Sequence, residues 1–187
     1  MKKRFKGGML VLLTLVSLNG LCQYSSPADT FPVPKEDPDI LFYLQRQPNS
    51  NTIIVNLNIK NGQVDTDNPV NVFWRRYQED GRKARLNFIQ KEFAYGIRTQ
   101  KIADGVYILN FVSYKKMKFR LERDKGNVWR VYSNLQNGGR MILRRIYIHV
   151  NGGSFWKPHI EYVELKGADP ATHKEIRERI TLKNIDT

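Results

Sequence analysis

The stretch IIVNLNIKNG, residues 53–62, shows the pattern that decides the fold. Its apolar side chains alternate with a second, more polar set, and the apolar set is Ile53, Val55, Leu57 and Ile59. A period of two residues predicts a half-buried β-strand. The Asn61-Gly62 dipeptide that follows is typical of a tight turn between antiparallel strands.

Comparable segments recur on the carboxyl side of this stretch, about every ten residues, with Gly- and Asn-containing turns between them. We expect strands at residues 70–77 (VNVFWRRY), 106–114 (VYILNFVSY), 117–122, 128–133, 141–150 and 158–165. Segment 106–114 is apolar on both faces, which indicates a central or covered strand. Short connections favour antiparallel pairing of neighbours. The prediction is an all-β fold, mainly an antiparallel meander, closed as a β-barrel or packed as a β-sandwich.

Residues 87–95 (NFIQKEFAY) depart from the strand pattern and predict one short helix. Asn87 and Gln90 have the spacing of a capping box. The apolar residues that fall on one helical face are Leu86, Ile89 and Phe93. Gly96 follows the last turn as a candidate C-cap. We expect this helix to plug an end of the barrel or to cover a face of the sheet.

The first residues predict export. Lys2, Lys3, Arg4 and Lys6 precede residues 9–18 (MLVLLTLVSL), an apolar run that is shorter than the about 20 residues needed to span a bilayer. This order is typical of a cleavable signal peptide at residues 1–22. Cleavage after Cys22 makes Gln23 the new N-terminus. Lipidation of Cys22 is the alternative, which the bulky Leu21 disfavours.

Four segments follow from this organisation. After the signal peptide, residues 23–38 hold four prolines without apolar periodicity, which predicts an extended leader segment rather than a packed element. Residues 39–183 form a single β-rich domain, and residues 184–187 are a frayed tail. Without Cys22 the mature chain has no cysteine, so its core alone must stabilise it.

The protein is strongly basic, with a formal net charge of +13. The signal peptide carries four of these positive charges and no acidic residue, so the mature chain keeps +9. An exported protein meets anionic glycans, lipid headgroups and envelope proteins rather than nucleic acid, and these are the partners we expect. The charge alone also fits a purely solubilising role. No transmembrane helix is expected in the mature chain, and the oligomeric state stays open.

Basic and aromatic residues occur side by side in three of the expected strands. The candidate binding residues are Trp74, Arg75, Arg76, Lys115, Lys116, Arg144, Arg145 and Tyr147. Arg144 and Arg145 should point to opposite faces of one strand, so that one of them faces the apolar side or a cavity. Such an arginine needs an anionic partner, and an internal carboxylate is favoured over a ligand.

Catalytic chemistry finds little support in the residues. The mature chain lacks cysteine and a G-x-S-x-G motif. Its histidines, His149, His159 and His173, match no common metal-ligand spacing. Glu161 and Glu164 should point to opposite faces of a strand, which disfavours them as a catalytic pair. No catalytic residue, cofactor or metal is therefore assigned.

A non-enzymatic domain that binds an anionic ligand or envelope partner is the leading hypothesis. A hydrolase acting on cell-envelope glycan or lipid, and a structural accessory subunit of a surface complex, are the alternatives. Convergence of two carboxylates, or of a histidine and a carboxylate, in a cleft would favour an enzyme. A convex basic surface or an apolar barrel mouth would favour binding.

Four sequence blocks carry a resemblance to a known family: VNVFWRRYQEDG (70–81), LNFIQKEFAYGI (86–97), FVSYKK (111–116) and GGSFWKPHIEYVELKGADPATHKE (152–175). Together they resemble an uncharacterised family of exported proteins, mostly from Bacteroidetes, known as domain of unknown function 4833 (DUF4833). The resemblance extends from about Asp39 to Lys183. It implies export but no activity or catalytic residue, and an N-terminal Gln23 is similar to that of other exported proteins of the group.

Overall fold

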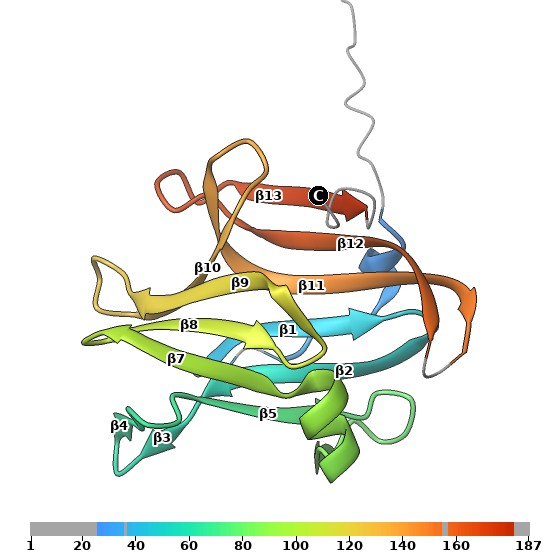
Figure 1. Cartoon of the computed structure of the whole chain (residues 1–187), viewed down its shortest axis with the longest axis horizontal. Coiled ribbons are helices and arrows are strands. Elements are labelled where there is room, and N and C mark those ends of the chain that lie inside the picture. Colours follow the sequence, from blue (N-terminus) through green and yellow to red (C-terminus); the bar gives the residue numbers. More distant parts are fainter. Residues whose placement is uncertain (1–25, 36, 155–156, 182–187) are drawn as a thin grey trace, which may run out of the picture.

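The computed structural model describes residues 26–35, 37–154 and 157–181. Most of this chain forms one curled sheet in the shape of a half-barrel (Figure 1), which confirms the prediction of an all-β fold. The signal peptide, the fate of Cys22 and the tail at 184–187 lie outside the described residues and stay predictions. No helix in the described part is long and apolar enough to cross a membrane.

The strands are β1 (Ile40–Arg46), β2 (Asn49–Leu57), β3 (Ile59–Lys60), β4 (Gln63–Val64), β5 (Val70–Arg75), β6 (Lys83–Arg85), β7 (Ile97–Ala103), β8 (Val106–Phe111), β9 (Tyr114–Arg123), β10 (Trp129–Asn134), β11 (Arg140–Gly153), β12 (Pro158–Ala168) and β13 (Glu175–Thr181). Within the described residues, eleven of them form one sheet. Its main path runs β6-β5-β2-β1-β11-β10-β9-β8-β7, with β12 and β13 added beside β11. Strands β3 and β4 form a separate hairpin at the predicted Asn61-Gly62 turn.

Strand β11 is the branch point of the sheet. One of its edges pairs with β12, while the other pairs first with β10 and then, from Arg145 onward, with β1. Leu143 and Arg145 face consecutive residues of β12, so Arg144 is the extra residue of a β-bulge. The bulge shifts the alternation, and both Leu143 and Ile146 therefore point into the same core. Because β1 and β11 are parallel, the sheet is not a pure antiparallel meander.

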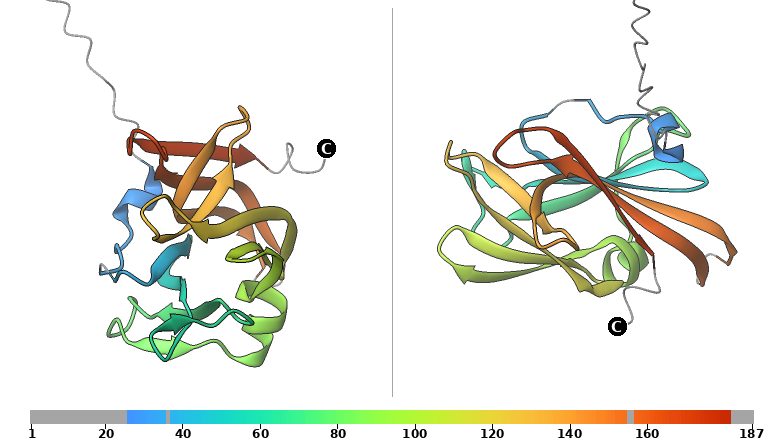
Figure 2. Two further views of the ribbon diagram at one scale, coloured as in Figure 1. Left: turned by 90° about the vertical axis from the view of Figure 1, so that its left-hand side faces the viewer. Right: turned by 90° about the horizontal axis from the view of Figure 1, so that it is seen from above.

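The core lies inside the curl of the sheet. Strands β7, β8 and β9 fold over β1, β2 and β5 (Figures 1 and 2), and the two outer edges approach each other without joining. The most deeply buried side chains include Phe42, Ile53, Leu109, Phe119, Leu121 and Leu143. Full burial of each such side chain contributes about 1.5–3 kcal/mol to folding. The half-barrel is held by these contacts, and one of its ends stays open.

The N-terminal arm, Ser26–Phe31, packs on the outer face of the sheet. It contains a 3-10 helix, η1 (Pro27–Thr30), which is capped by the Ser26 hydroxyl and by the Asp29 carboxylate. Ala28 is fully buried against Tyr147 and Tyr162 of strands β11 and β12. The expectation that residues 23–38 hold no packed element is therefore wrong for this arm, because capping and the small Ala28 side chain let it dock closely.

Candidate functional site

A short helix lies at the open end of the half-barrel, where the sequence predicts one. Asn87 and Gln90 form the expected reciprocal capping bonds: the Gln90 N–H donates to Asn87 Oδ1 at 2.8 Å, and the Asn87 N–H donates to Gln90 Oε1 at 3.1 Å. A helical turn at residues 88–89 then widens into a π-helix, η2 (Gln90–Tyr95). π-Helical turns are rare in proteins, but those that do occur often lie at functional sites.

Gly96 ends the helix, but not through the left-handed conformation that its residue type suggests. Its φ is −61° in extended backbone. A side chain at Gly96 would collide with the carbonyl oxygen of Lys91, because the wide π turn brings that carbonyl close. The glycine is therefore required by close approach rather than by a positive φ.

Three contacts fix η2 across the open end. The Trp74 indole N–H of β5 donates to Gln90 Oε1 at 3.1 Å, and the Trp74 ring meets the Tyr95 ring edge-on at 5.1 Å. On the opposite side, the Ser113 hydroxyl donates to the Ala94 carbonyl at 2.6 Å, from the turn between β8 and β9. The helix thus connects β5 with the β8–β9 turn and partly covers the mouth of the half-barrel.

An apolar hollow of about 300 Å³ lies beneath this helix. Side chains from η2, β1, β9, β11 and β12 line it, among them Leu44, Ile89, Phe93, Met117, Ile148 and Ile160. Two of these come from the helix, and they are still exposed to solvent on their outer side: Ile89 at 49% and Phe93 at 67%. The predicted apolar face of the helix therefore borders the hollow instead of being buried.

A polar cleft of about 420 Å³ adjoins the hollow on the side of the β1–β2 turn. Its lining includes Arg46, Asn49, Asn51, Trp74, Arg76 and Gln90. Leu44, Arg46, Gln90 and Tyr95 line both spaces, so the two are direct neighbours. Arg76 has a surface ion pair with Glu79 at 2.6 Å. Among the residues that the structure describes, no carboxylate pairs with Arg46.

The candidate residues at the end of β5 are Trp74, Arg75 and Arg76, and their side chains lie on different sides of the sheet. Trp74 and Arg76 reach the polar cleft. Arg75 points to the outer face, where its guanidinium lies 6.0 Å from the centre of the Phe73 ring and donates to the Gly81 carbonyl at 3.4 Å. Only two of the three predicted residues of this strand therefore belong to the open end.

The other candidates divide in the same way. Lys115 and Lys116 are exposed at the start of β9, directly after residues that line the apolar hollow. Arg144 is exposed at the bulge of β11. Arg145 and Tyr147 are buried on the outer face, where a ligand in solution cannot reach them. The eight predicted residues thus lie at several separate places on the sheet rather than in one patch.

Arg145 has the internal partner that the sequence favours. Its side chain is 3% exposed and contacts Glu164 at 3.4 Å, Asp29 at 3.1 Å and the Ala28 carbonyl at 3.1 Å. Arg179 contacts the other oxygen of Glu164 at 3.2 Å. The buried arginine is therefore part of an ion-pair network inside the protein, not a ligand site.

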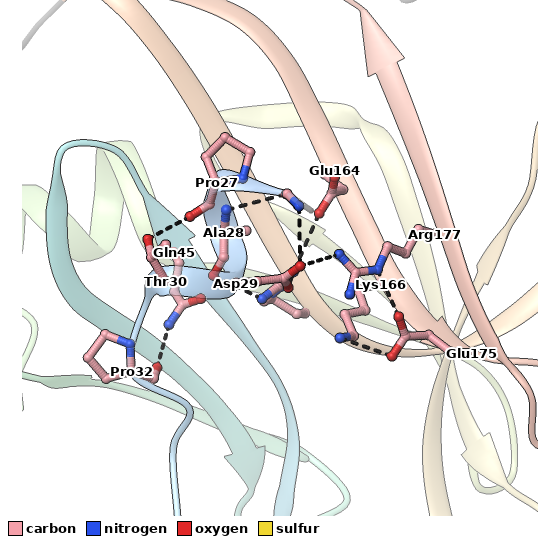
Figure 3. Close-up of polar contacts among 12 residues, drawn as sticks. Pro27, Ala28, Asp29, Thr30, Pro32, Gln45, Glu164, Lys166, Glu175 and Arg177 are labelled. Atoms are coloured by element: carbon pink, nitrogen blue, oxygen red, sulfur yellow. Dashed lines mark hydrogen bonds and ion pairs between the residues drawn. The ribbon is translucent and has the colours of Figure 1, made fainter. Parts of the chain in front are cut away.

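The same network holds the N-terminal arm (Figure 3). Asp29 accepts hydrogen bonds from Arg145 and from Arg177, the latter at 2.7 Å. Partial burial opposes ionisation of Asp29, but the hydrogen bonds from Arg177, Arg145 and the Ser26 backbone outweigh it and lower the pKa of Asp29 to about 2. The arm is thus docked by a carboxylate that stays charged in ordinary buffers.

Tyr147 has a structural role in this region. Burial, with smaller contributions from Tyr162 and Glu164, raises the pKa of Tyr147 to about 12. Its hydroxyl donates to Gln47 Oε1 at 3.0 Å, and its ring meets the Phe31 ring of the arm edge-on at 5.4 Å. These contacts fasten the arm and the β1–β2 turn to β11.

One histidine and one carboxylate meet elsewhere. His149 Nε2 lies 3.3 Å from Glu161 Oε2, and the His149 ring stacks on Tyr162 at 4.7 Å. Neither residue lines the apolar hollow or the polar cleft. In the described part of the chain, no group of three or more histidine, cysteine, aspartate or glutamate residues could hold a metal ion.

The comparisons with known proteins give one result. The family model "Domain of unknown function (DUF4833)" matches residues 42–179, which is most of the chain. The chain belongs to the DUF4833 family. Curated proteins and solved structures gave no match. The match of this DUF4833 protein covers β1 to β13 and therefore includes every strand that lines the hollow and the cleft, but not the N-terminal arm.

Proposed function

We propose that this protein is an exported, non-enzymatic binding protein for an amphiphilic, anionic ligand such as a fatty acid or a single-chain lipid. Its hydrocarbon part occupies the apolar hollow, and its head lies in the polar cleft. The observation that carries the proposal is that the two spaces adjoin and that Leu44 and Arg46 line both. One strand, β1, therefore contributes an apolar contact and a guanidinium to one site.

The hollow supports the hydrocarbon part of the ligand. Its lining side chains are mostly aliphatic or aromatic, and its volume is at the lower end of the range of about 300–1,000 Å³ for small-molecule sites. Burial of a hydrocarbon chain there removes apolar surface from water at about 25 cal/mol per Å². A purely polar glycan would gain nothing from this surface, so a lipid is the better fit among the expected polyanions.

The cleft supports the anionic head. Arg46 can offer a carboxylate or phosphate two parallel N–H donors, and no carboxylate among the described residues competes for it. The side-chain oxygens of Asn49 and Asn51 accept backbone hydrogen bonds from Asn51 and Gln78, at 2.7 and 3.0 Å. Their amide N–H groups therefore remain as further donors to an anion.

The same lining argues for binding rather than hydrolysis. Where the structure describes the lining of the two spaces, it contains no aspartate, glutamate or histidine that could act as a general acid or base. The pair of His149 and Glu161 lies outside both. Export through the signal peptide at residues 1–22 is part of the proposal and would place this ligand in the periplasm or outside the cell.

Titration with a fluorescent long-chain fatty acid tests the proposal. The parent should show saturable binding that unlabelled fatty acid displaces, and Ile160→Trp, which fills the hollow, should abolish it. Arg46→Gln should weaken binding about tenfold, because a charge-assisted hydrogen bond is worth about 1.5–3 kcal/mol. Arg144→Gln removes an exposed arginine outside the site and is the matched control.

Two results would overturn the proposal. One is the absence of saturable binding by the parent to fatty acid, alkyl phosphate and lysophospholipid probes. The other is an equal effect of Arg46→Gln and Arg144→Gln on binding, which would mean that Arg46 contributes only through the net charge of the protein.

A further inference from the structure

The helix at the mouth presents apolar side chains outward as well as inward. Phe88 is 73% exposed, and Ile89 and Phe93 are exposed beside it within six residues of chain. The other large apolar residues that are exposed in the described chain lie singly on separate elements, and they are Val33, Ile59, Ile102 and Val128. Clustered exposed apolar residues mark an interaction surface, whereas single ones are normal.

Two lysines accompany this apolar cluster. Lys91 is exposed on the helix itself. Lys115 is exposed at the start of β9, two residues after Ser113, whose 2.6 Å hydrogen bond to the Ala94 carbonyl holds the β8–β9 turn against the helix. Glu92 is the acidic residue of the helix, so the positive side chains outnumber the negative one here. We call Phe88, Ile89, Lys91, Phe93 and Lys115 the lip.

We propose that the lip docks on the surface of an anionic lipid membrane, with the tips of Phe88 and Phe93 among the acyl chains and with Lys91 and Lys115 at the headgroups. Aromatic side chains favour the membrane interface, and each lysine near an anionic leaflet strengthens attachment. Ile89 and Phe93 belong both to the lip and to the lining of the hollow. Docking therefore brings the hollow to the level from which a lipid chain could enter.

Charge decides between a membrane and a second copy of the chain. A symmetric contact through this surface would bring together two lysines and one glutamate from each copy, so that two surfaces of net positive charge would meet, and like charges at a contact are unfavourable. An anionic membrane turns this repulsion into attraction, so that both lysines strengthen binding. The aromatic cluster alone fits either partner, whereas the cluster together with its lysines fits the membrane.

Docking rests only in part on the proposed function, since a membrane surface could recruit the protein even if the hollow bound no lipid. The variants keep the two separate. Phe88 does not line the hollow, so Phe88→Asp should leave fatty-acid binding in solution unchanged while it weakens membrane binding. Ile160→Trp should have the opposite pattern. A failure of docking is then distinguishable from a failure of ligand binding.

Co-sedimentation with vesicles is the decisive measurement. The parent should bind vesicles of phosphatidylcholine mixed with phosphatidylglycerol and should bind pure phosphatidylcholine much more weakly, with binding that falls as salt is added. Phe88→Asp should reduce the partition coefficient about tenfold or more, because it puts a charge in place of the aromatic ring that enters the membrane. Lys115→Glu should reduce it by a similar factor, because it exchanges an attractive charge for a repulsive one.

The chain offers matched controls at the far end of strand β9. Val128→Asp and Lys125→Glu make the same kinds of change at exposed positions of the β9–β10 turn, about 30 Å from Lys115 at the rise of an extended strand. Both should bind vesicles like the parent.

Equal vesicle binding by Phe88→Asp and Val128→Asp would overturn the proposal. So would a change in sedimentation of the free protein from dimer to monomer caused by Phe88→Asp without an effect on vesicle binding, which would assign the lip to contact between copies. All four variants alter exposed side chains, so melting temperatures near that of the parent should confirm that they fold.

Discussion

The outer face of β11–β13 and the open end of the half-barrel use arginines in opposite ways. On the outer face, Arg145 is buried between Glu164 and Asp29, and its ion-pair partners belong to the protein itself. At the open end, Arg46 lines a polar cleft that adjoins an apolar hollow, and no carboxylate of the described chain pairs with it. The first arrangement stabilises the fold, and the second can stabilise something bound to it.

The difference shows that sequence context does not reveal which arginine serves a ligand. Arg75, Arg76 and Arg145 each lie within two residues of an aromatic side chain, and the three are alike in this respect in the linear sequence. Only the fold separates them, because the bulge at Arg144 turns Arg145 away from solvent and the N-terminal arm then covers it. Predictions that disturb one region and spare the other can test this division.

Arg145→Met should have the largest effect on stability. Loss of one partner from a buried ion pair typically costs about 3–5 kcal/mol, because the remaining charge stays in a medium that solvates it poorly. Arg179 still contacts Glu164, so we expect about 3 kcal/mol, at the lower end of that range. Denaturant unfolding followed by tryptophan fluorescence measures the change, and fatty-acid affinity of the folded fraction should stay unchanged.

Two further variants sharpen this prediction. Arg144→Met removes the neighbouring but exposed arginine and should change stability by less than about 0.5 kcal/mol. The double variant Arg145→Met with Glu164→Gln should lose less than the two single variants together, because both members of one pair are removed. Additive losses would mean that the two side chains do not interact in solution.

Much of the fold could be predicted because its signals are local. The alternation around Ile53 and the Asn-Gly turn after it identify strands and hairpins, and these are properties of neighbouring residues. The same holds for the helix, since the capping box of Asn87 and Gln90 spans only four residues and forms as expected. Local chemistry of this kind does not depend on the rest of the chain.

The hollow and the cleft at the open end could not be predicted, because their lining residues are distant in sequence. Strand β1 escapes notice as a short apolar run after a proline-rich segment, and its parallel pairing with β11 joins residues about a hundred positions apart. Arg46 was therefore missed, although the apolar run Ile40–Leu44 before it could have indicated a strand. Strand β13 was missed because its charged side chains hide the alternation of Ile176 and Ile180.

The arm was misjudged for a related reason. Its prolines and lack of periodicity predict an extended leader, whereas Pro27–Thr30 form a capped 3-10 helix. Packing against a distant surface needs no periodicity, since one small residue, Ala28, and one carboxylate, Asp29, make the main contacts. Such docking has no signature in the local sequence.

Asn87→Ala should have an intermediate effect, at the open end rather than on the outer face. Removal of the Oδ1 acceptor leaves the Gln90 N–H without its partner and should destabilise the protein by on the order of 1 kcal/mol. Asn87→Asp keeps the acceptor and is the matched control, which should stay close to the parent. Thermal unfolding measures both, and equal melting temperatures for all three proteins would show that the capping bond does not contribute.

Asp29→Asn should have the smallest effect, and that effect should depend on pH. The folded pKa of Asp29, about 2, lies below its ordinary value of 3.8, so the ionised carboxylate favours the folded state. This contribution is fully present above about pH 4 and is lost as the pH falls through 2. Partly exposed ion pairs are worth about 0–1 kcal/mol, so the parent should exceed the variant only slightly in melting temperature at neutral pH.

The pH dependence identifies the origin of that small difference. Between about pH 4 and pH 2 the melting temperatures of parent and Asp29→Asn should converge, because the parent loses its charge and the variant has none to lose. Asp104→Asn, which alters a fully exposed carboxylate, controls for the general loss of stability in acid and should differ from the parent equally little at every pH. A gap between parent and Asp29→Asn that persists unchanged to pH 2 would mean that the side chain holds the arm through its shape and not through its charge. Convergence would instead establish that the outer face is closed by ion pairs within the chain, which is the condition that separates it from the open end.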